Sequence, residues 1–393
     1  MYSIKMAEIK GKNKGEWSEM YIFFKLMSDR KVYVADKDMN KLKDVFLNIV
    51  SIIREEVAGK EYRYFTGDKV VITLNGETVM TLDSSLFTEK AARVWKMITE
   101  NKGNTTFTDE EIKEFLESIF IHNISAPAQK KNDYFGGTKD IVLDTIDYRS
   151  GVSQIMGFSC KSDIDAASTL FNASGDNTNF EYELVGNMTD EIMNEFNSLF
   201  NEVIRKGVVC HDVATGNRMN YLKSCGIDVK FVNPVKETAR QNLIRCGGLE
   251  TPAVVAEMLK YYYYDKSGTA TALDEAIKHL AESDPAGYSF GELYDTYHLK
   301  IANLLYSMFT GLRFSKPWNG KSDVSGGYIV VKRDGDVVAF HSCIADEFKD
   351  FLVDKLKFEA PSCSRHDYMS IYKKDDGKYY LKFALQFRFK LKK

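Results

Sequence analysis

Residues 136–161 constrain this chain more than any other stretch, because they predict a β-hairpin with opposite charges on its two strands. The segment reads GGTKDIVLDTIDYRSGVSQIMGFSCK. Asp140 precedes an apolar run, a turn follows, and a second run ends at Lys161. Successive side chains of a strand point to opposite faces, so Ser159 and Lys161 share one face while Cys160 points to the other. The hairpin can therefore bring a carboxylate and an ammonium group to one side of a sheet.

This pair of charges is the minimal equipment for hydrolysing a phosphodiester. Asp140 would hold a divalent metal ion, and Lys161 would orient or deprotonate a water molecule. Two solvated charges at strand ends explain the same residues without any chemistry. The hairpin alone leaves both explanations open.

Several stretches, read together, resemble the HpaII-type restriction endonucleases. They are NKGEWSEMY at residues 13–21, GFSCKS at 157–162, TLFNASGDNTNF at 169–180, PWNGKSDVSGGYIVVK at 317–332 and FEAPSCSRHDY at 358–368. The resemblance runs in order from about residue 14 to about residue 389, and residues 187–314 are its least distinctive part. It implies a PD-(D/E)-x-K nuclease core, with Asp140 as the aspartate and Lys161 as the lysine.

The chain departs from that pattern two residues before the lysine, where an acid is normal and Ser159 stands instead. The resemblance implies that Ser159 belongs to the catalytic set with Asp140 and Lys161. It also implies that the carbonyl group of Cys160 helps Asp140 to bind Mg²⁺. A second metal-binding acid must come from elsewhere in the chain or be missing.

Two groups of acids are candidates for that second ligand. Glu16 and Glu19 lie three residues apart on the first turns of a predicted helix at residues 15–27, so they can share a face. Favourable charge at a helix N-terminus explains them without a metal. We place Glu16 ahead of Glu19. The acids after the hairpin are Asp163, Asp165, Glu181 and Glu183, of which we place Glu181 first.

Two polar stretches predict contacts with DNA. Asn172, Ser174 and Asn179 belong to a donor-rich segment that can hold a phosphate or read a base edge, although turn-rich loops have the same composition. Arg365 can bind guanine through two hydrogen bonds and His366 can reach a phosphate or a base, although an Arg–Asp surface pair is the alternative. The further basic candidates are Lys321, Lys332, Arg333 and Arg388.

The pattern of elements predicts an α/β (α+β) fold, with a mixed sheet flanked by helices, a largely helical middle region and a C-terminal region that contains strands. Apolar spacing predicts a helix at residues 41–56 and another at 187–205. We expect a nuclease core at residues 1–206 and a DNA-recognition part at 207–393.

The composition excludes several classes of protein. The formal net charge is −3, so positive charge for nucleic acid would have to be clustered locally. The six cysteines are scattered without a C-x-x-C pair and the six histidines without an H-E-x-x-H motif, which argues against zinc. No apolar run approaches the ~20 residues that span a bilayer, and the basic N-terminal stretch lacks the apolar region of a secretory signal. We expect a cytoplasmic protein.

These residues, with the resemblance, predict a Mg²⁺-dependent type II restriction endonuclease. It would cut double-stranded DNA at a short palindrome of the CCGG kind and leave a 5′-phosphate. A palindromic target suggests a homodimer, and a cognate cytosine methyltransferase would be its genetic partner. The alternatives are a structure- or end-specific repair nuclease of the same fold and a catalytically inactive DNA-binding protein, which the serine at position 159 permits.

Overall fold

The chain forms two compact units whose boundaries do not follow a single cut. The computed structural model describes residues 11–36, 38–101, 106–124, 139–148, 150–164, 169–205, 207–289, 291–321, 326–341 and 345–390. Unit 1 comprises residues 1–168 and 322–348, and unit 2 comprises residues 169–321 and 349–393. This division differs from the predicted cut at residue 206, because strands after residue 168 join the sheets of unit 2 and two later strands return to unit 1.

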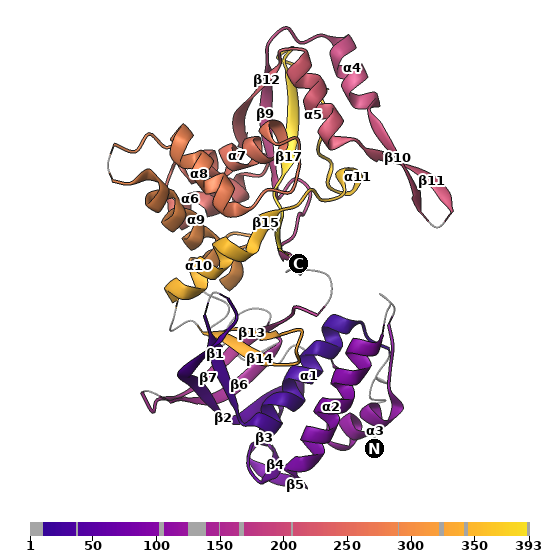
Figure 1. The fold of residues 1–393 in the computed structure, drawn as a ribbon, viewed down its shortest axis with the longest axis vertical. Coiled ribbons are helices and arrows are strands. Elements are labelled where there is room, and N and C mark those ends of the chain that lie inside the picture. Colours follow the sequence, from indigo (N-terminus) through magenta and orange to yellow (C-terminus); the bar gives the residue numbers. More distant parts are fainter. Residues whose placement is uncertain are drawn as a thin grey trace. The chain divides into compact units, whose positions relative to one another are not determined.

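Unit 1 is built on a nine-stranded mixed sheet in the order β1-β14-β13-β7-β6-β2-β3-β4-β5 (Figure 1). The pairs β1–β14 and β13–β7 are parallel and the others antiparallel. Strand β1 also pairs with β2. The strands β1, β14, β13, β7, β6 and β2 therefore form a closed ring. The strands are β1 (Lys31–Ala35), β2 (Lys41–Val57), β3 (Lys60–Phe65), β4 (Lys69–Leu74), β5 (Glu77–Asp83), β6 (Ile141–Asp147), β7 (Ser153–Ser162), β13 (Gly327–Val331) and β14 (Val337–His341).

The long strand β2 corrects the helix predicted at residues 41–56. It pairs with β1 through its first half, with β3 through its second half and with β6 across the middle. The segment is rich in β-branched residues, which favour strands. It also buries four consecutive residues from Ser51 to Arg54, so both of its faces are covered there and the alternation typical of a strand disappears. The remaining apolar spacing imitated that of a helix.

Helices α1 (Lys14–Asp29), α2 (Ser84–Glu100) and α3 (Glu110–Ser118) complete the core of unit 1. Helix α1 begins at a capping box in which Asn13 and Glu16 exchange side-chain and backbone hydrogen bonds. Helices α1 and α2 lie side by side (Figure 1), and α1 packs against β2 and β7. Trp17, Phe24 and Met27 of α1 are fully buried in the core that α1 shares with the sheet and the other two helices. The predicted helix at residues 15–27 is confirmed.

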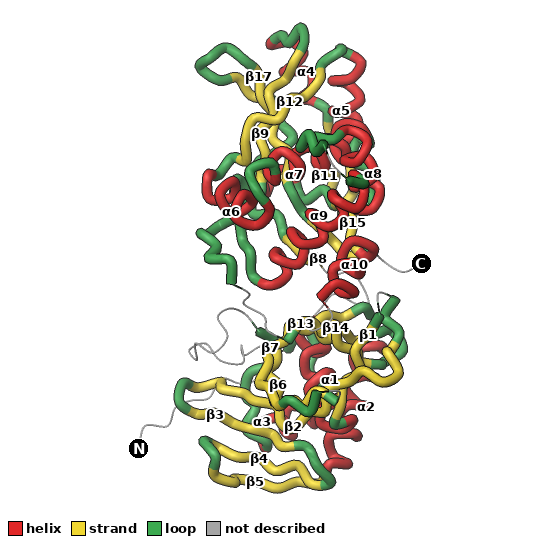
Figure 2. The backbone as a smooth tube through the Cα atoms, turned by 90° about the vertical axis from the view of Figure 1, so that its left-hand side faces the viewer, coloured by secondary structure: helices red, strands yellow, loops and turns green. Residues whose placement is uncertain are grey.

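Unit 2 contains three smaller sheets and most of the helices (Figure 2). A four-stranded sheet has the order β12-β9-β17-β16, a three-stranded sheet the order β15-β18-β8, and β10 and β11 form a separate hairpin. The strands are β8 (Thr169–Phe171), β9 (Asn179–Val185), β10 (Phe200–Arg205), β11 (Val208–Val213), β12 (Asp228–Pro234), β15 (Leu356–Phe358), β16 (Tyr372–Lys373), β17 (Tyr379–Ala384) and β18 (Phe387–Phe389).

The middle region of unit 2 is helical, as predicted. Helix α7 packs against β12 and β17, and the buried hydroxyl group of Tyr182 in β9 donates a hydrogen bond to the carbonyl of Ala256 in α7. The helices are α4 (Asp190–Ser198), α5 (Thr215–Ser224), α6 (Glu237–Gly247), α7 (Thr251–Lys260), a π-helical turn (Tyr261–Asp265), α8 (Leu273–Ser283), α9 (Leu293–Thr310), α10 (Ala345–Lys355) and α11 (Cys363–His366). None of the described helices combines the length and hydrophobicity needed to cross a membrane.

The helix predicted at residues 187–205 is shorter than expected. Helix α4 ends at Ser198, and β10 takes the remaining residues. The fully buried Arg218 of α5 explains this end, because its guanidinium group donates hydrogen bonds to the carbonyl groups of Asn197 and Leu199. Those two carbonyl groups therefore have partners outside the helix.

Truncation of a buried residue of β2 should destabilise the protein strongly. Ile52 is fully buried, so Ile52→Ala should lower the free energy of unfolding by about 2–5 kcal/mol. The control is Ile204→Ala, since Ile204 is 77% exposed and its truncation should change stability by less than about 0.5 kcal/mol. Urea unfolding followed by tryptophan fluorescence measures both. Equal losses in the two variants would contradict the placement of β2 in the core.

Candidate active site

Asp140 lies immediately before β6 and is fixed to the neighbouring strand β7. Its backbone NH group donates to the carbonyl of Phe158 at 3.0 Å. Its Oδ2 atom accepts two hydrogen bonds, from the Ser159 hydroxyl at 2.8 Å and from the Cys160 backbone NH group at 2.7 Å. The Oδ1 atom accepts no hydrogen bond from the described residues. One oxygen of the carboxylate is thus used for positioning, and the other is available.

The position of Ser159 explains how the chain tolerates the loss of an acid there. An ionised acid at residue 159 could not donate a hydrogen bond to Asp140, because a carboxylate only accepts. The serine hydroxyl group instead donates to Asp140. In the folded protein Ser159 holds the aspartate, a role that its position two residues before Lys161 did not reveal.

Lys161 lies on the same face of β7 as Ser159. Strand β13 runs parallel to β7, with Tyr328 beside Ser159 and Val330 beside Lys161. The Lys161 ammonium group lies 5.7 Å from the centre of the Tyr328 ring, which is a cation–π distance. It forms no ion pair with any carboxylate group that the structure describes. Tyr328 therefore orients the lysine without neutralising it, and the hairpin sequence alone gives no sign of this contact.

Gly157 allows the chain to approach the site closely. A Cβ atom at this position would lie 2.1 Å from Cδ of Lys139, the buried residue that precedes Asp140. The aliphatic stem of Lys139 thus occupies the space above Gly157. Any larger residue at 157 would displace Lys139 and, through the backbone, Asp140.

Glu19 of α1 is the acid whose electrostatic environment links it to Asp140. Burial, followed by the negative charges of Asp140 and Glu16, raises its pKa to about 8 against the opposing effects of Arg54 and Lys161. A carboxyl group that is disfavoured in its charged form beside another carboxylate is characteristic of a site built for a cation. The helical spacing identified Glu16 and Glu19 together, and the placing of Glu16 ahead of Glu19 stays a prediction.

Glu16 has a defined structural task at the start of α1. Its carboxylate accepts from the Asn13 backbone NH group at 2.9 Å and forms an ion pair with Lys12 at 3.2 Å. Both contacts are those of a helix cap. Its role as a metal ligand stays a prediction, and the structure gives Glu19 the more direct electrostatic connection to Asp140.

Of the acids that follow the hairpin, Asp165 lies outside the described residues, and Asp163 stays in unit 1 directly after β7, where it forms an ion pair with Arg333 at 3.7 Å. Glu181 belongs to β9 of unit 2, where its two oxygens accept from the Tyr372 hydroxyl at 2.5 Å and from Lys374 at 2.7 Å. Glu183 of the same strand pairs with Lys378. The chain leaves the sheet of unit 1 after β7, so Glu181 is not brought to Asp140 within that unit.

The donor set fits a hard divalent cation such as Mg²⁺. The described residues contain no cluster of three His, Cys, Asp or Glu side chains that could hold a metal. Mg²⁺ does not need one, because it commonly binds through one or two carboxylates and completes its shell with water and substrate phosphates. The carboxyl groups of Asp140 and Glu19 carry oxygen atoms of this kind. Burial raises the pKa of the Cys160 thiol well above its usual value, so only the carbonyl group of that residue suits the predicted role.

The two stretches predicted to contact DNA come together in unit 2. The Gly175 backbone NH group donates to Nδ1 of His366 at 3.2 Å, and Nδ2 of Asn179 donates to the His366 carbonyl at 2.8 Å. Burial and the charge of Arg365 lower the pKa of His366, which favours the neutral imidazole that accepts this hydrogen bond. The Arg365 side chain is exposed and forms no ion pair with a described residue.

The other predicted DNA contacts separate into exposed and buried residues. Asn172, Ser174 and Lys321 are accessible on the surface of unit 2. Asn179 is fully buried and holds α11, so the structure corrects its predicted role as a surface contact. Arg388 of β18 forms an ion pair with Glu359. Residue type identified these donors but did not indicate which of them point inward.

Comparisons with known proteins identify the family of this chain. A model of the HpaII restriction endonuclease family matches residues 13–389, and the chain belongs to that family. The type II restriction enzyme HpaII of Haemophilus parainfluenzae is 30% identical over 389 residues, which cover 98% of this chain and 100% of that protein. No solved structure matches the chain significantly. The resemblance noted in the sequence is confirmed.

Replacement of Glu19 by Gln should flatten the pH dependence of stability in the metal-free protein. The pKa of about 8 in the folded state lies above the usual 4.5, so the folded protein binds more protons than the unfolded chain. Stability should therefore fall as the pH rises from 4.5 to about 8, by at most about 1.4 kcal/mol per pH unit from this group.

Urea unfolding in EDTA at several pH values between 5 and 8 measures this effect. Glu77→Gln is the matched control, since Glu77 is exposed on β5 and its replacement should leave the slope unchanged. Identical slopes for the wild type and Glu19→Gln would show that Glu19 does not hold its proton in the folded state.

Proposed function

We propose that this restriction endonuclease hydrolyses phosphodiesters of double-stranded DNA in a Mg²⁺-dependent reaction at a short palindrome of the CCGG kind. The observation that most supports this proposal is that the Asp140 carboxylate accepts hydrogen bonds from Ser159 and from the Cys160 backbone. Lys161 lies on the same face of β7 as Ser159. Membership of the HpaII restriction endonuclease family supports site-specific cleavage of DNA. The CCGG target rests on the family resemblance.

We propose further that unit 1 is a PD-(D/E)-x-K nuclease core. The mixed sheet, the hairpin β6–β7 and the helix α1 that carries Glu19 support this assignment. Asp140 takes the place of the family aspartate and Lys161 that of the lysine. Glu19 supplies from a helix the acid that position 159 lacks, and this substitution keeps two carboxyl groups at the site.

Each of these residues would have its own role in the hydrolysis of the phosphodiester. Asp140 and Glu19, with the Cys160 carbonyl, would hold Mg²⁺. When bound, such an ion lowers the pKa of a water molecule and polarises the phosphate. Lys161 orients the attacking water and offsets the negative charge that develops on the phosphate oxygens. The water loses a proton as its oxygen binds phosphorus, the bond to the 3′ oxygen breaks, and that oxygen gains a proton. The products carry a 5′-phosphate and a 3′-hydroxyl.

Several properties follow from the proposed target. A palindrome has two-fold symmetry, so two copies of the chain in a symmetric dimer would cut both strands. The host would need a cytosine methyltransferase that protects the same sites. We propose a cytoplasmic location, because the enzyme must meet its DNA substrate there.

Asp140→Ala and Lys161→Ala should each lower DNA cleavage at least about 100-fold, because each removes a group that stabilises the transition state. Binding to DNA should persist in both. The measurement is digestion of phage DNA of known sequence in Mg²⁺, followed by sequencing of the fragment ends. Lys60→Ala, on an exposed position of β3, is the control and should cut as the wild type does. A smear in place of discrete fragments would contradict site-specific cleavage.

Mg²⁺ should raise the thermal midpoint of unfolding of the wild-type protein, because a ligand that binds only the folded state stabilises it. Asp140→Ala should abolish this shift. Lys161→Ala should retain it, since the lysine is not a ligand. Differential scanning fluorimetry with and without millimolar Mg²⁺ measures all three proteins. A shift that survives in Asp140→Ala would place the cation at a different site.

A further inference from the structure

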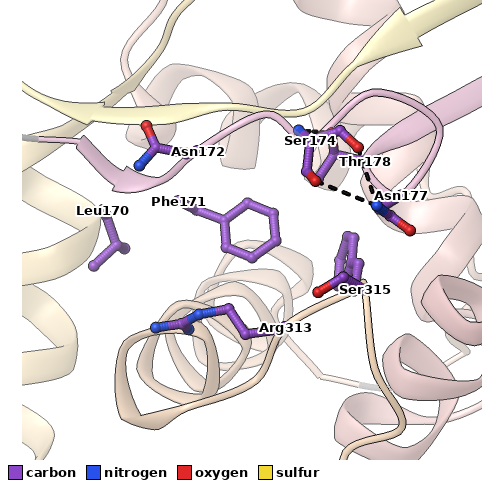
Figure 3. A pocket seen from close by; sticks show the side chains of 9 residues that line it. Leu170, Phe171, Asn172, Ser174, Asn177, Thr178, Arg313 and Ser315 are labelled. Carbon is purple, nitrogen blue, oxygen red and sulfur yellow. Dashed lines mark hydrogen bonds between the residues drawn. The ribbon is translucent and has the colours of Figure 1, made fainter. Parts of the chain in front are cut away.

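Unit 2 contains a trough between two segments that are far apart in the sequence (Figure 3). Its volume is about 220 Å³. One wall comes from β8 and the loop after it, with Phe171, Asn172 and Ser174. The other wall follows α9 and contributes Arg313 and Ser315. Figure 3 places the Phe171 ring at the centre, with polar groups on both sides.

The polar groups of the trough differ in how far they are already satisfied. The Thr178 hydroxyl accepts from the Ser174 backbone NH group, and the Asn177 amide donates to the Ser174 hydroxyl and carbonyl. These contacts fix the loop. By contrast, the exposed side chains of Asn172 and Ser315 make no hydrogen bond with a described residue. They leave donors free on both walls.

Arg313 supplies a fixed positive charge. Its Nη1 atom donates to the Met308 carbonyl at 2.7 Å and to the Leu312 carbonyl at 2.9 Å, which anchors the guanidinium group to the end of α9. Nε and Nη2 donate to no described residue, and none of the described residues that line the trough carries a carboxylate. An anchored guanidinium with unused donors, beside free hydroxyl and amide groups, suits an anion with several oxygens, above all a phosphate.

The size of the trough and the side chains at its floor further restrict the kind of ligand that it can bind. A volume of about 220 Å³ lies below the ~300–1,000 Å³ of pockets that hold drug-sized ligands. A phosphate with one attached sugar fits this space. The buried Phe171 ring, which meets Phe314 at a centroid distance of 5.0 Å, offers an apolar surface for the sugar carbons. Reading a base would instead require paired donors and acceptors aimed at one edge.

We propose that this trough binds a backbone phosphate of the DNA duplex and its deoxyribose, as a contact that does not depend on the base sequence. The inference rests on the proposed function, because it takes DNA as the substrate. Such contacts set the position of a protein on the duplex without reading it. Unit 2 would thus bind the DNA backbone through Arg313. The residues proposed for the reaction belong to unit 1.

Equilibrium binding of two duplexes, one with a CCGG site and one without, tests the proposal at several salt concentrations in EDTA. Arg313→Gln should weaken binding to both duplexes by the same factor, about 5- to 10-fold, and should reduce the slope of log K against log salt by about 0.9. Arg240→Gln is the control. It removes the same charge from α6, where Arg240 pairs with Glu237, and should leave binding within about twofold of the wild type.

A second variant guards against a loss of structure in Arg313→Gln, since that residue also caps α9. Ser315→Glu keeps every contact of Arg313 and places a negative charge in the trough, and it should weaken both duplexes to a similar degree. Unchanged affinity and salt slope in both variants would overturn the proposal. So would a loss confined to the CCGG duplex, which would indicate base reading. A wild-type protein that binds neither duplex would instead overturn the proposed function.

Discussion

The carboxylate of Asp140 depends on two donors from the adjacent strand, and the site is organised around that attachment. Both donors use the same oxygen, so the carboxylate is oriented while its second oxygen remains available. The serine at position 159 is one of the two donors. Glu19 of α1 is coupled to this carboxylate, because burial and the negative charge of Asp140 both raise the pKa of Glu19.

The surroundings of Lys161 illustrate how a cation is kept available. An ion pair would fix the ammonium group but would also cancel much of its charge. The ring of Tyr328 instead attracts it through the negative face of the aromatic system. The lysine therefore retains its full charge for a substrate oxygen. This arrangement requires β13 to lie parallel to β7 in a register that sets Tyr328 beside Ser159.

Rules that use only local sequence predicted the side-chain directions in the hairpin. They did not predict the elements that pack around it. Alternation along a strand placed Ser159 and Lys161 on one face and Cys160 on the other, because that relation depends only on the backbone. The choice between Glu16 and Glu19 depended on which carboxylate the helix cap would occupy and on the burial of α1 against the sheet. Neither is visible in the spacing. Likewise, β2 is covered on both faces by elements distant in sequence, so its burial pattern resembled that of a helix. The residue type of Asn179 indicated a hydrogen-bond donor, but the sequence did not show that its side chain is buried.

The order of elements along the chain has a consequence for synthesis. The sheet of unit 1 is interrupted after β7 by residues 169–321, and β13 and β14 arrive only afterwards. A growing chain on the ribosome therefore cannot seat Tyr328 beside Lys161, or close the ring of strands, until all of that inserted segment has been made. Nascent or prematurely terminated chains lack this support for Lys161. This restriction endonuclease therefore acquires its complete nine-stranded sheet only when translation is nearly finished.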